Sequence, residues 1–279
     1  MRIITEKLIH SFENHLLNEE KSNATVKKYI HDIRLFKKWL NGRSANKKTA
    51  LQYKALLAQK YKPTSVNSAI SSLNSFFAYH EWYDCKVRTL KIQKCIFAPK
   101  ERVLTKHEYE RLVETALRKK NKRLCLLMQA ICSTGIRVSE LSCITVQAVE
   151  DGTSTISSKG KIRRLFLPKP LRRSLKQYIK EQKITSGPVF VTSSGRPLDR
   201  SNIWSEMKKL CNKAGVCKDK VFPHNLRHLF ARTYYSMHKD IVRLADILGH
   251  SSINTTRIYT VENGEVHMRQ IEKLGLLRC

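Results

Sequence analysis

The chain has 279 residues, more than one compact core usually holds, and this length favours two domains. It carries 53 Lys and Arg against 23 Asp and Glu, and nucleic acid is the polyanion that most often explains a formal net charge of +30. Because the charges alternate with apolar positions and form no low-complexity block, the composition argues against a protein that is mainly a disordered basic tail.

The N-terminal part contains four segments with apolar residues at three- and four-residue spacing, which is typical of amphipathic helices. Ser22 is a predicted N-cap, Asn41-Gly42 a predicted helix end, and Pro63 marks the break before the last segment. We therefore predict a helical domain over residues 1–90. Its four helices are expected at 4–19, 22–41, 49–61 and 64–82.

Residues 91–102 contain Pro99 and several basic residues without sustained periodicity, so they are the predicted interdomain linker. Thr105 followed three residues later by Glu108 is the pattern of a capping box and predicts a new helix. The second domain is expected to span 103–279.

The second domain shows helical periodicity interrupted by alternation of apolar and polar residues. Residues 153–157 and 162–167 predict an antiparallel hairpin whose turn is Lys159-Gly160-Lys161, and 188–192 predict a third short strand. The fold class is therefore mainly α with a small antiparallel β-sheet. Further helices are expected at 121–134, 137–144, 170–183, 199–214, 224–237, 239–248, 252–259 and 264–275.

The eight cysteines are scattered, without a C-x-x-C pair or a Cys/His cluster at metal-ligand spacing. We expect reduced thiols and no metal site. No run of about 18 apolar residues occurs, and the N-terminus lacks the apolar segment of a signal peptide. These features predict a soluble, cytoplasmic protein that does not bind membranes.

Several charged and nucleophilic residues of the second domain, selected by the family resemblance given below, also suit phosphoryl transfer on chemical grounds. A phosphodiester under attack carries negative charge on its non-bridging oxygens, which the planar guanidiniums of Arg137 and Arg227 could bind bidentately. A tyrosine hydroxyl such as that of Tyr259 ordinarily has a pKa of about 10 and needs a base, which His224 could be. Lys159 could protonate the departing 5′ oxygen. This scheme requires no cofactor or metal.

This part of the chain contains five motifs: Thr134-Gly135-Ile136-Arg137-Val138-Ser139-Glu140-Leu141, Lys159-Gly160-Lys161, Pro223-His224-Asn225-Leu226-Arg227-His228, Leu248-Gly249-His250-Ser251 and Thr255-Thr256-Arg257-Ile258-Tyr259. In this order they resemble the tyrosine recombinase, or phage integrase, family, and the length is similar to that of its short Xer-type members. The resemblance implies a helical core-binding domain followed by a tyrosine recombinase catalytic domain. The catalytic residues that it implies are Arg137, Lys159, His224, Arg227, His250 and Tyr259.

The resemblance further implies a site-specific recombinase that cleaves and rejoins DNA through a 3′-phosphotyrosine intermediate. The biological event would be integration or excision of a mobile element, or DNA inversion or resolution. Its partners would be two double-stranded DNA sites and a homotetramer assembled through the C-terminal docking helix, 264–279, and an accessory protein could set direction. The protein would associate with the nucleoid when bound to DNA. Docking of that helix on its own domain stays open.

Other assignments also stay open. Lys161 lies two residues after Lys159 and could be the acid, although Lys159 precedes the glycine as in the family. His228 fits a packed helix histidine, and Glu140 fits a residue that orients Arg137. Two other functions are compatible with the fold: a non-catalytic DNA-binding accessory factor, whose hallmark would be a missing catalytic residue, and a type IB-like topoisomerase.

Overall fold

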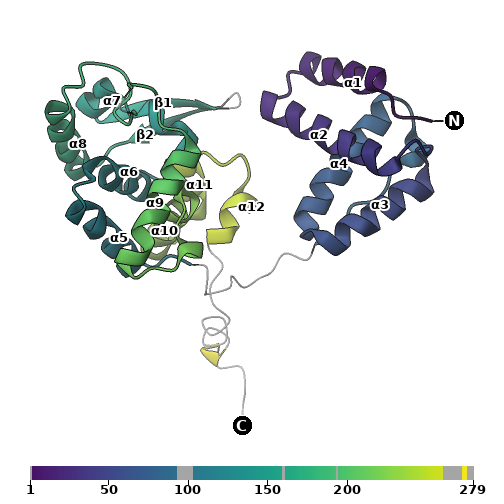
Figure 1. Ribbon diagram of the computed structural model, residues 1–279. Helices are drawn as coiled ribbons and strands as arrows, with labels where there is room; N and C mark the ends of the chain where they lie inside the picture. Colours follow the sequence, from purple (N-terminus) through teal and green to yellow (C-terminus); the bar gives the residue numbers. More distant parts are fainter. Residues whose placement is uncertain (1, 93–102, 159–160, 193, 260–271, 275–279) are drawn as a thin grey trace, which may run out of the picture. The chain divides into compact units, whose positions relative to one another are not determined.

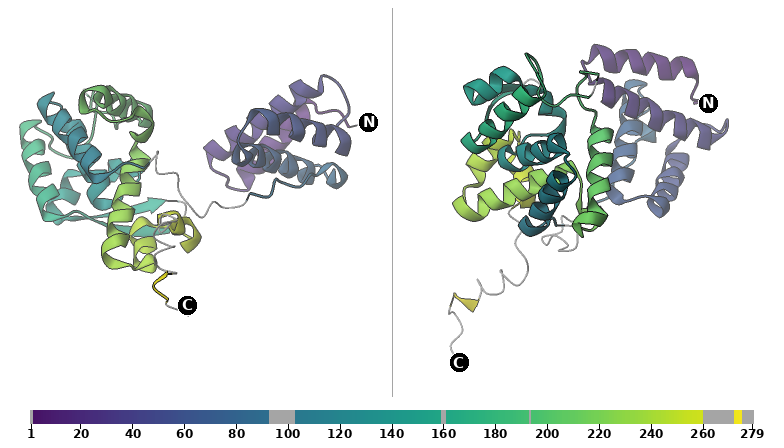
Figure 2. Two further views of the ribbon diagram at one scale, coloured as in Figure 1. Left: turned by 90° about the horizontal axis from the view of Figure 1, so that it is seen from below. Right: turned by 60° about the vertical axis from the view of Figure 1, so that its left-hand side comes forward.

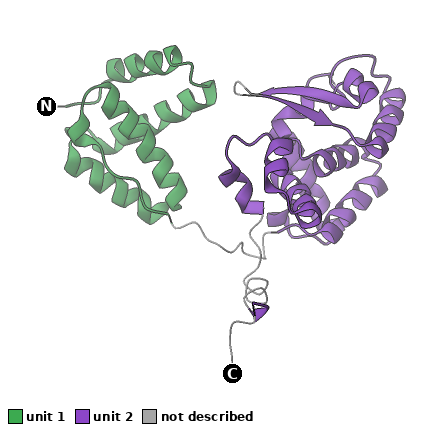
Figure 3. Cartoon of the chain, turned by 180° about the vertical axis from the view of Figure 1, so that it is seen from behind, with its two compact units in different colours: residues 1–94 green, residues 95–279 purple. Residues whose placement is uncertain are grey.

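The computed structural model of the protein describes residues 2–92, 103–158, 161–192, 194–259 and 272–274. The chain divides into two compact units, Met1–Lys94 and Cys95–Cys279 (Figure 3). In the described ranges, no helix is both long and apolar enough to cross a membrane. The predicted linker and the predicted helix at 264–275 fall almost entirely outside the described residues.

The first unit contains the four predicted helices (Figure 1). Their ends follow the sequence signals: the Ser22 side chain accepts a hydrogen bond from the Thr25 backbone N–H, and Asn41 ends its helix in the left-handed conformation. Buried aromatic rings, among them Phe12, Phe36 and Phe76, fill the core. The elements are α1 (Glu6–Asn18), α2 (Asn23–Leu40), α3 (Lys47–Lys60), α4 (Pro63–Tyr79) and the short 3₁₀ helix η1 (Tyr83–Cys85).

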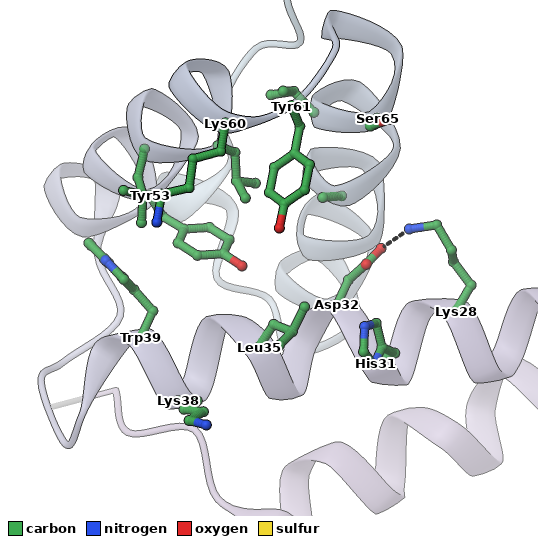
Figure 4. Close-up of a pocket in the computed structure, with 14 residues that line it drawn as sticks. Lys28, His31, Asp32, Leu35, Lys38, Trp39, Tyr53, Lys60, Tyr61 and Ser65 are labelled. Atoms are coloured by element: carbon green, nitrogen blue, oxygen red, sulfur yellow. Dashed lines mark hydrogen bonds and ion pairs between the residues drawn. The ribbon is translucent and has the colours of Figure 1, made fainter.

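A cavity of about 550 Å³ lies in this unit between α2, α3 and α4. Aromatic side chains, including Trp39, Tyr53 and Tyr61, form part of its wall, and Lys28 Nζ donates to Asp32 Oδ2 at 2.6 Å beside it (Figure 4). None of the five motifs contributes to this cavity, because all five lie in the second unit.

The second unit is mainly helical and contains one antiparallel hairpin along one side (Figures 1 and 2). The two strands of the hairpin are β1 (Thr153–Ser158) and β2 (Lys161–Phe166). The capping box predicted at Thr105 and Glu108 is present at the start of the first helix of the unit. Its helices are α5 (Lys106–Arg118), α6 (Lys122–Thr134), α7 (Val146–Asp151), α8 (Lys169–Glu181), α9 (Arg200–Ala214), α10 (Pro223–His238), α11 (Ile241–Leu248) and α12 (Ile253–Thr256), with 3₁₀ helices η3 (Val138–Cys143), η4 (Lys218–Lys220) and η5 (Arg257–Tyr259).

The third strand predicted at 188–192 is wrong. Pro188 and Val191 form only isolated bridges, to Thr145 and Pro197, so the described sheet has two strands. Val189 and Phe190 are nevertheless buried. A short apolar run records burial but not strand pairing, and here the run packs into the helical core.

Candidate active site

The C-terminal ends of helices α6 and α11 lie at the site. Helix α6 ends at Gly135 and α11 ends at Gly249, both in the left-handed conformation that glycine adopts without strain. The last carbonyls of a helix have no partner within it and carry partial negative charge. Here the carbonyls of Gly135, Leu248 and Gly249 accept hydrogen bonds from arginines. The C-terminal carbonyls of the two helices thus accept hydrogen bonds from guanidinium groups.

Arg227, on α10, is the guanidinium held most deeply, with 2% of its surface exposed. Its Nη1 donates to Gly135 O. Its Nη2 donates to Leu248 O at 2.7 Å and to His250 Nε2 at 3.0 Å. Burial, followed by the like charge of Arg137, lowers the pKa of Arg227 to about 10. The side chain therefore stays charged at neutral pH.

Arg137 precedes η3 and lies against the same helix end. Its Nη2 donates to Gly249 O at 3.1 Å, and its Nη1 donates to Glu140 Oε1 at 2.9 Å. Glu140 also accepts from Arg163 Nη2 at 2.6 Å, so it orients Arg137 as predicted and bridges two arginines. Burial alone would raise the pKa of Glu140, but hydrogen bonds from Arg137 and the charge of Arg163 outweigh it and leave that pKa lowered.

The cluster therefore contains three guanidiniums, those of Arg137, Arg163 and Arg227, and one carboxylate, that of Glu140. A phosphate group would balance the positive excess and could receive charge-assisted hydrogen bonds. The clustered charge is suited to a phosphodiester.

His250 is neutral in this arrangement. A guanidinium can only donate, so His250 Nε2 must accept from Arg227, and Nδ1–H donates to Thr256 Oγ1 at 2.8 Å. Burial, followed by the charges of Arg227 and Arg137, lowers the pKa of His250 to about 4. The imidazole thus supports Arg227 through a fixed tautomer.

Tyr259 lies in η5 with 4% of its surface exposed, and its ring lies close to two histidine rings. The centroid of His228 lies 4.8 Å away, edge to face, and that of His250 lies 6.0 Å away in a stacked arrangement. His224 is exposed near the start of α10, and the centroid of its ring lies 4.4 Å from that of His228. Desolvation and then the charges of Arg227 and neighbouring arginines lower the pKa of His224, which leaves a neutral imidazole able to accept a proton.

The structure thus gathers five of the six predicted catalytic residues, all except Lys159, in one place. Lys159 lies outside the described residues, and Lys161 begins β2 without a described side chain. His228 is packed in the helix as predicted, but it also touches Tyr259, and burial lowers its pKa to about 4.

Arg163 is the member of this cluster that sequence reasoning missed. Its side chain is 10% exposed, whereas Ile162 before it is 77% exposed and Leu165 after it is 2% exposed. Alternate residues of a strand share a face, so Arg163 lies on the buried face with Leu165. A charged residue in the inward phase of a predicted strand was the signal that could have found it.

Gly249→Ala is expected to destabilise the protein more than Gly187→Ala. Both glycines have positive φ, +63° and +75°, where a residue with a Cβ is strained by about 1 kcal/mol. At position 249 the added Cβ would also lie 2.4 Å from Arg163 Cδ, whereas at 187 it would meet nothing within 4 Å. We expect the melting temperature to fall by about 2–4 °C for Gly187→Ala and by clearly more for Gly249→Ala. Equal shifts in thermal unfolding would contradict the packing of Arg163 on Gly249.

The described part of the chain contains neither a disulfide nor a cluster of metal-binding side chains. The cysteines among the described residues are free thiols. Within the same residues, no group of three or more His, Cys, Asp and Glu side chains is arranged to hold a metal ion.

Family models and curated relatives match nearly the whole chain. The phage integrase family matches residues 102–265, and the phage integrase N-terminal SAM-like domain matches residues 9–83. Tyrosine recombinase XerA of Pyrococcus furiosus is 30% identical over 287 residues, which cover 99% of this chain and 96% of that protein. XerA of Thermococcus kodakarensis is 30% identical over 283 residues, covering 97% and 96%.

Solved structures show the same fold. The crystal structure of XerA recombinase matches with a TM-score of 0.53 and 25% identity, covering 99% of this chain and 100% of that one. A lambda integrase dimer bound to a core site matches with a TM-score of 0.75 and 17% identity, covering 91% and 94%. The family matches and the near full-length relatives lead to one conclusion: this chain belongs to the phage integrase family of tyrosine recombinases.

Proposed function

We propose that the protein is a site-specific DNA recombinase that cuts and rejoins strands through a 3′-phosphotyrosine intermediate. The observation that carries the proposal is the position of Tyr259 beside the cationic cluster of Arg137 and Arg227. The relatives support it, because the XerA proteins are named tyrosine recombinases and a XerH structure holds its difH DNA substrate before cleavage.

In the proposed reaction, the Tyr259 hydroxyl oxygen attacks the scissile phosphorus and the bond from phosphorus to the 5′ oxygen breaks. Arg137 and Arg227 bind the non-bridging oxygens, whose negative charge grows in the transition state. His224 accepts the tyrosine proton, and Lys159 donates a proton to the leaving oxygen. His250 holds Arg227 in place. The phosphotyrosine bond keeps the energy of the broken phosphodiester, so rejoining needs no ATP.

The proposed partners are double-stranded recombination sites and further copies of the chain. A lambda integrase tetramer has been solved on a Holliday junction, and we propose a homotetramer on two DNA sites here. Residues 264–279 would join neighbouring protomers, with docking on their own unit as the alternative. The reaction would take place in the cytoplasm, on nucleoid DNA, with or without an accessory protein.

One experiment separates recombination from the other functions of this fold. DNA from around the protein's own gene is incubated with the chain, and covalent adducts are mapped on denaturing gels. Products that require two matched sites support recombination. Relaxation of any supercoiled plasmid without a preferred site would indicate a type IB-like topoisomerase, and binding without an adduct would indicate an accessory factor.

Lys159→Ala is expected to slow cleavage of ordinary DNA by about 10²–10⁴-fold, the range of general acid catalysis. Cleavage should recover on DNA whose bridging 5′ oxygen is replaced by sulfur, because a thiolate leaves without a proton. Single-turnover cleavage of both substrates measures this.

Lys161→Ala is the matched control, because it removes the same charge from the same hairpin. Its cleavage rate on ordinary DNA should remain close to that of the unsubstituted protein. If only Lys161→Ala is rescued by sulfur, Lys161 is the acid and the assignment of Lys159 is wrong.

A further inference from the structure

Arg163 comes from the hairpin but makes its contacts with the elements that carry the rest of the site. Its Nη1 donates to Ile247 O at 2.8 Å, in the last turn of α11, and its Nη2 donates to Glu140 Oε2 at 2.6 Å. Its aliphatic part crosses Gly249, where an added Cβ would lie 2.4 Å from Cδ. One side chain therefore touches the end of α11 next to His250 and the carboxylate that orients Arg137.

Because Arg163 lies on β2, its contacts with Ile247 and Glu140 also hold the hairpin against the rest of the unit. The described sheet has only two strands, and an isolated hairpin of two strands is marginally stable in water. In Figure 3 one end of the hairpin of residues 153–158 and 161–166 projects beyond the helices of its unit, while Ile156 and Leu165 are buried in the core of that unit. The pair of Arg163 and Ile156 lies on the inward face, with Ile156 1% exposed. The orientation of the hairpin therefore depends on the hydrogen bonds of Arg163 and on the packing of the buried side chains of Ile156 and Leu165.

Lys159 belongs to the same hairpin, four residues before Arg163. The strand β2 runs back from Arg163 to Lys161, two residues or about 7 Å at about 3.3 Å per residue. A tilt at Arg163 displaces this end of β2, and an acid must come within about 3 Å of the atom that it protonates. Fixing the base of the hairpin is therefore a requirement for placing the lysine.

We propose that Arg163 is a positioning residue that sets the hairpin of Lys159 relative to the cluster of Arg137, Arg227 and His250. It does not touch the reacting phosphate in this proposal. It acts through the ion pair with Glu140 and the hydrogen bond to Ile247 O, which fix the lysine relative to the bound phosphate. The proposal rests on the proposed function, because it assumes that the hairpin supplies the proton to the leaving oxygen.

The test is single-turnover cleavage by Arg163→Met at saturating protein, on ordinary DNA and on DNA with a bridging 5′ sulfur. If Arg163 positions the lysine, cleavage of ordinary DNA falls by about 10²-fold and the sulfur substrate recovers most of the rate. The double variant with Lys159→Ala should be no slower than Lys159→Ala alone, because both changes remove the same proton transfer. A protein defective only in phosphate binding or folding would be slow on both substrates.

Two further variants keep the test decisive. Arg164→Met removes the same charge from the neighbouring exposed position of β2, and it should cleave both substrates at nearly the normal rate. Arg163→Lys keeps the charge but replaces the two-nitrogen fork that binds Glu140 and Ile247 O by a single ammonium, so we expect a smaller loss that sulfur also relieves. Circular dichroism checks that each variant is folded.

Three results would overturn the proposal: normal rates for Arg163→Met, equal losses on both substrates, or a double variant much slower than Lys159→Ala. The proposed function fails in a different way, since it requires the unsubstituted protein to form a phosphotyrosine adduct. An adduct with the unsubstituted protein, together with any of these three results, rejects the role of Arg163 alone.

Discussion

Tyr259→Phe is expected to abolish covalent attachment to DNA while leaving DNA binding almost unchanged. The substitution removes one oxygen atom, the proposed nucleophile, and no charge. The phenyl ring keeps its packing against His228 and His250, whose centroids lie 4.8 Å and 6.0 Å away, so η5 should stay in place. A denaturing gel measures the adduct, and a mobility shift measures binding on the same DNA.

Tyr234→Phe is the matched control. Tyr234 is partly buried against the same cluster as Tyr259, so its substitution removes an identical atom from a nearby ring. We expect normal adduct formation in this variant. If the adduct persists in Tyr259→Phe, another residue is the nucleophile and the proposed mechanism is wrong.

Arg227→Ala is expected to lower the cleavage rate by at least 10³-fold. Loss of one preorganised donor to a developing oxyanion commonly costs 10²–10³ in rate, and this guanidinium also fixes His250. Arg227→Lys should recover little of the rate, because a single ammonium cannot reproduce a planar fork that binds Leu248 O and a phosphate together. Single-turnover cleavage at saturating protein gives the rates without a contribution from DNA affinity.

Stability must be separated from chemistry in this experiment. Arg227→Ala leaves the carbonyls of Gly135 and Leu248 without their donor, and each unsatisfied buried group costs about 1–3 kcal/mol. Arg232→Ala on the same helix is the control, because Arg232 is also partly buried but donates to Leu104 O at 2.8 Å and His228 O at 3.4 Å instead of the carbonyls that hold Arg227. We expect a lower melting temperature in both variants but a large loss of cleavage only in Arg227→Ala. Comparable cleavage by the two folded variants would reject the phosphate-binding role of Arg227.

The sequence by itself determined the elements and the chemical groups. Caps at Ser22 and at Thr105 with Glu108 act within one turn of chain, and helical periodicity is a property of neighbouring residues, so both could be predicted locally. The order of the motifs around Arg137, Arg227 and Tyr259 was enough to predict the family, which the comparisons show.

Tertiary structure alone decided how those groups meet. Arg227 binds the end of α6, 92 residues away, and Arg137 binds the end of α11, 112 residues away. Such contacts arise when packed helices bring unpaired carbonyls together, and no local pattern encodes which carbonyl an arginine will reach. The neutral tautomer of His250 follows from its contact with Arg227, and the burial of Arg163 follows from the packing of β2 against α11. The short apolar run at 188–192 is likewise buried without strand partners, because burial and pairing are separate outcomes of packing.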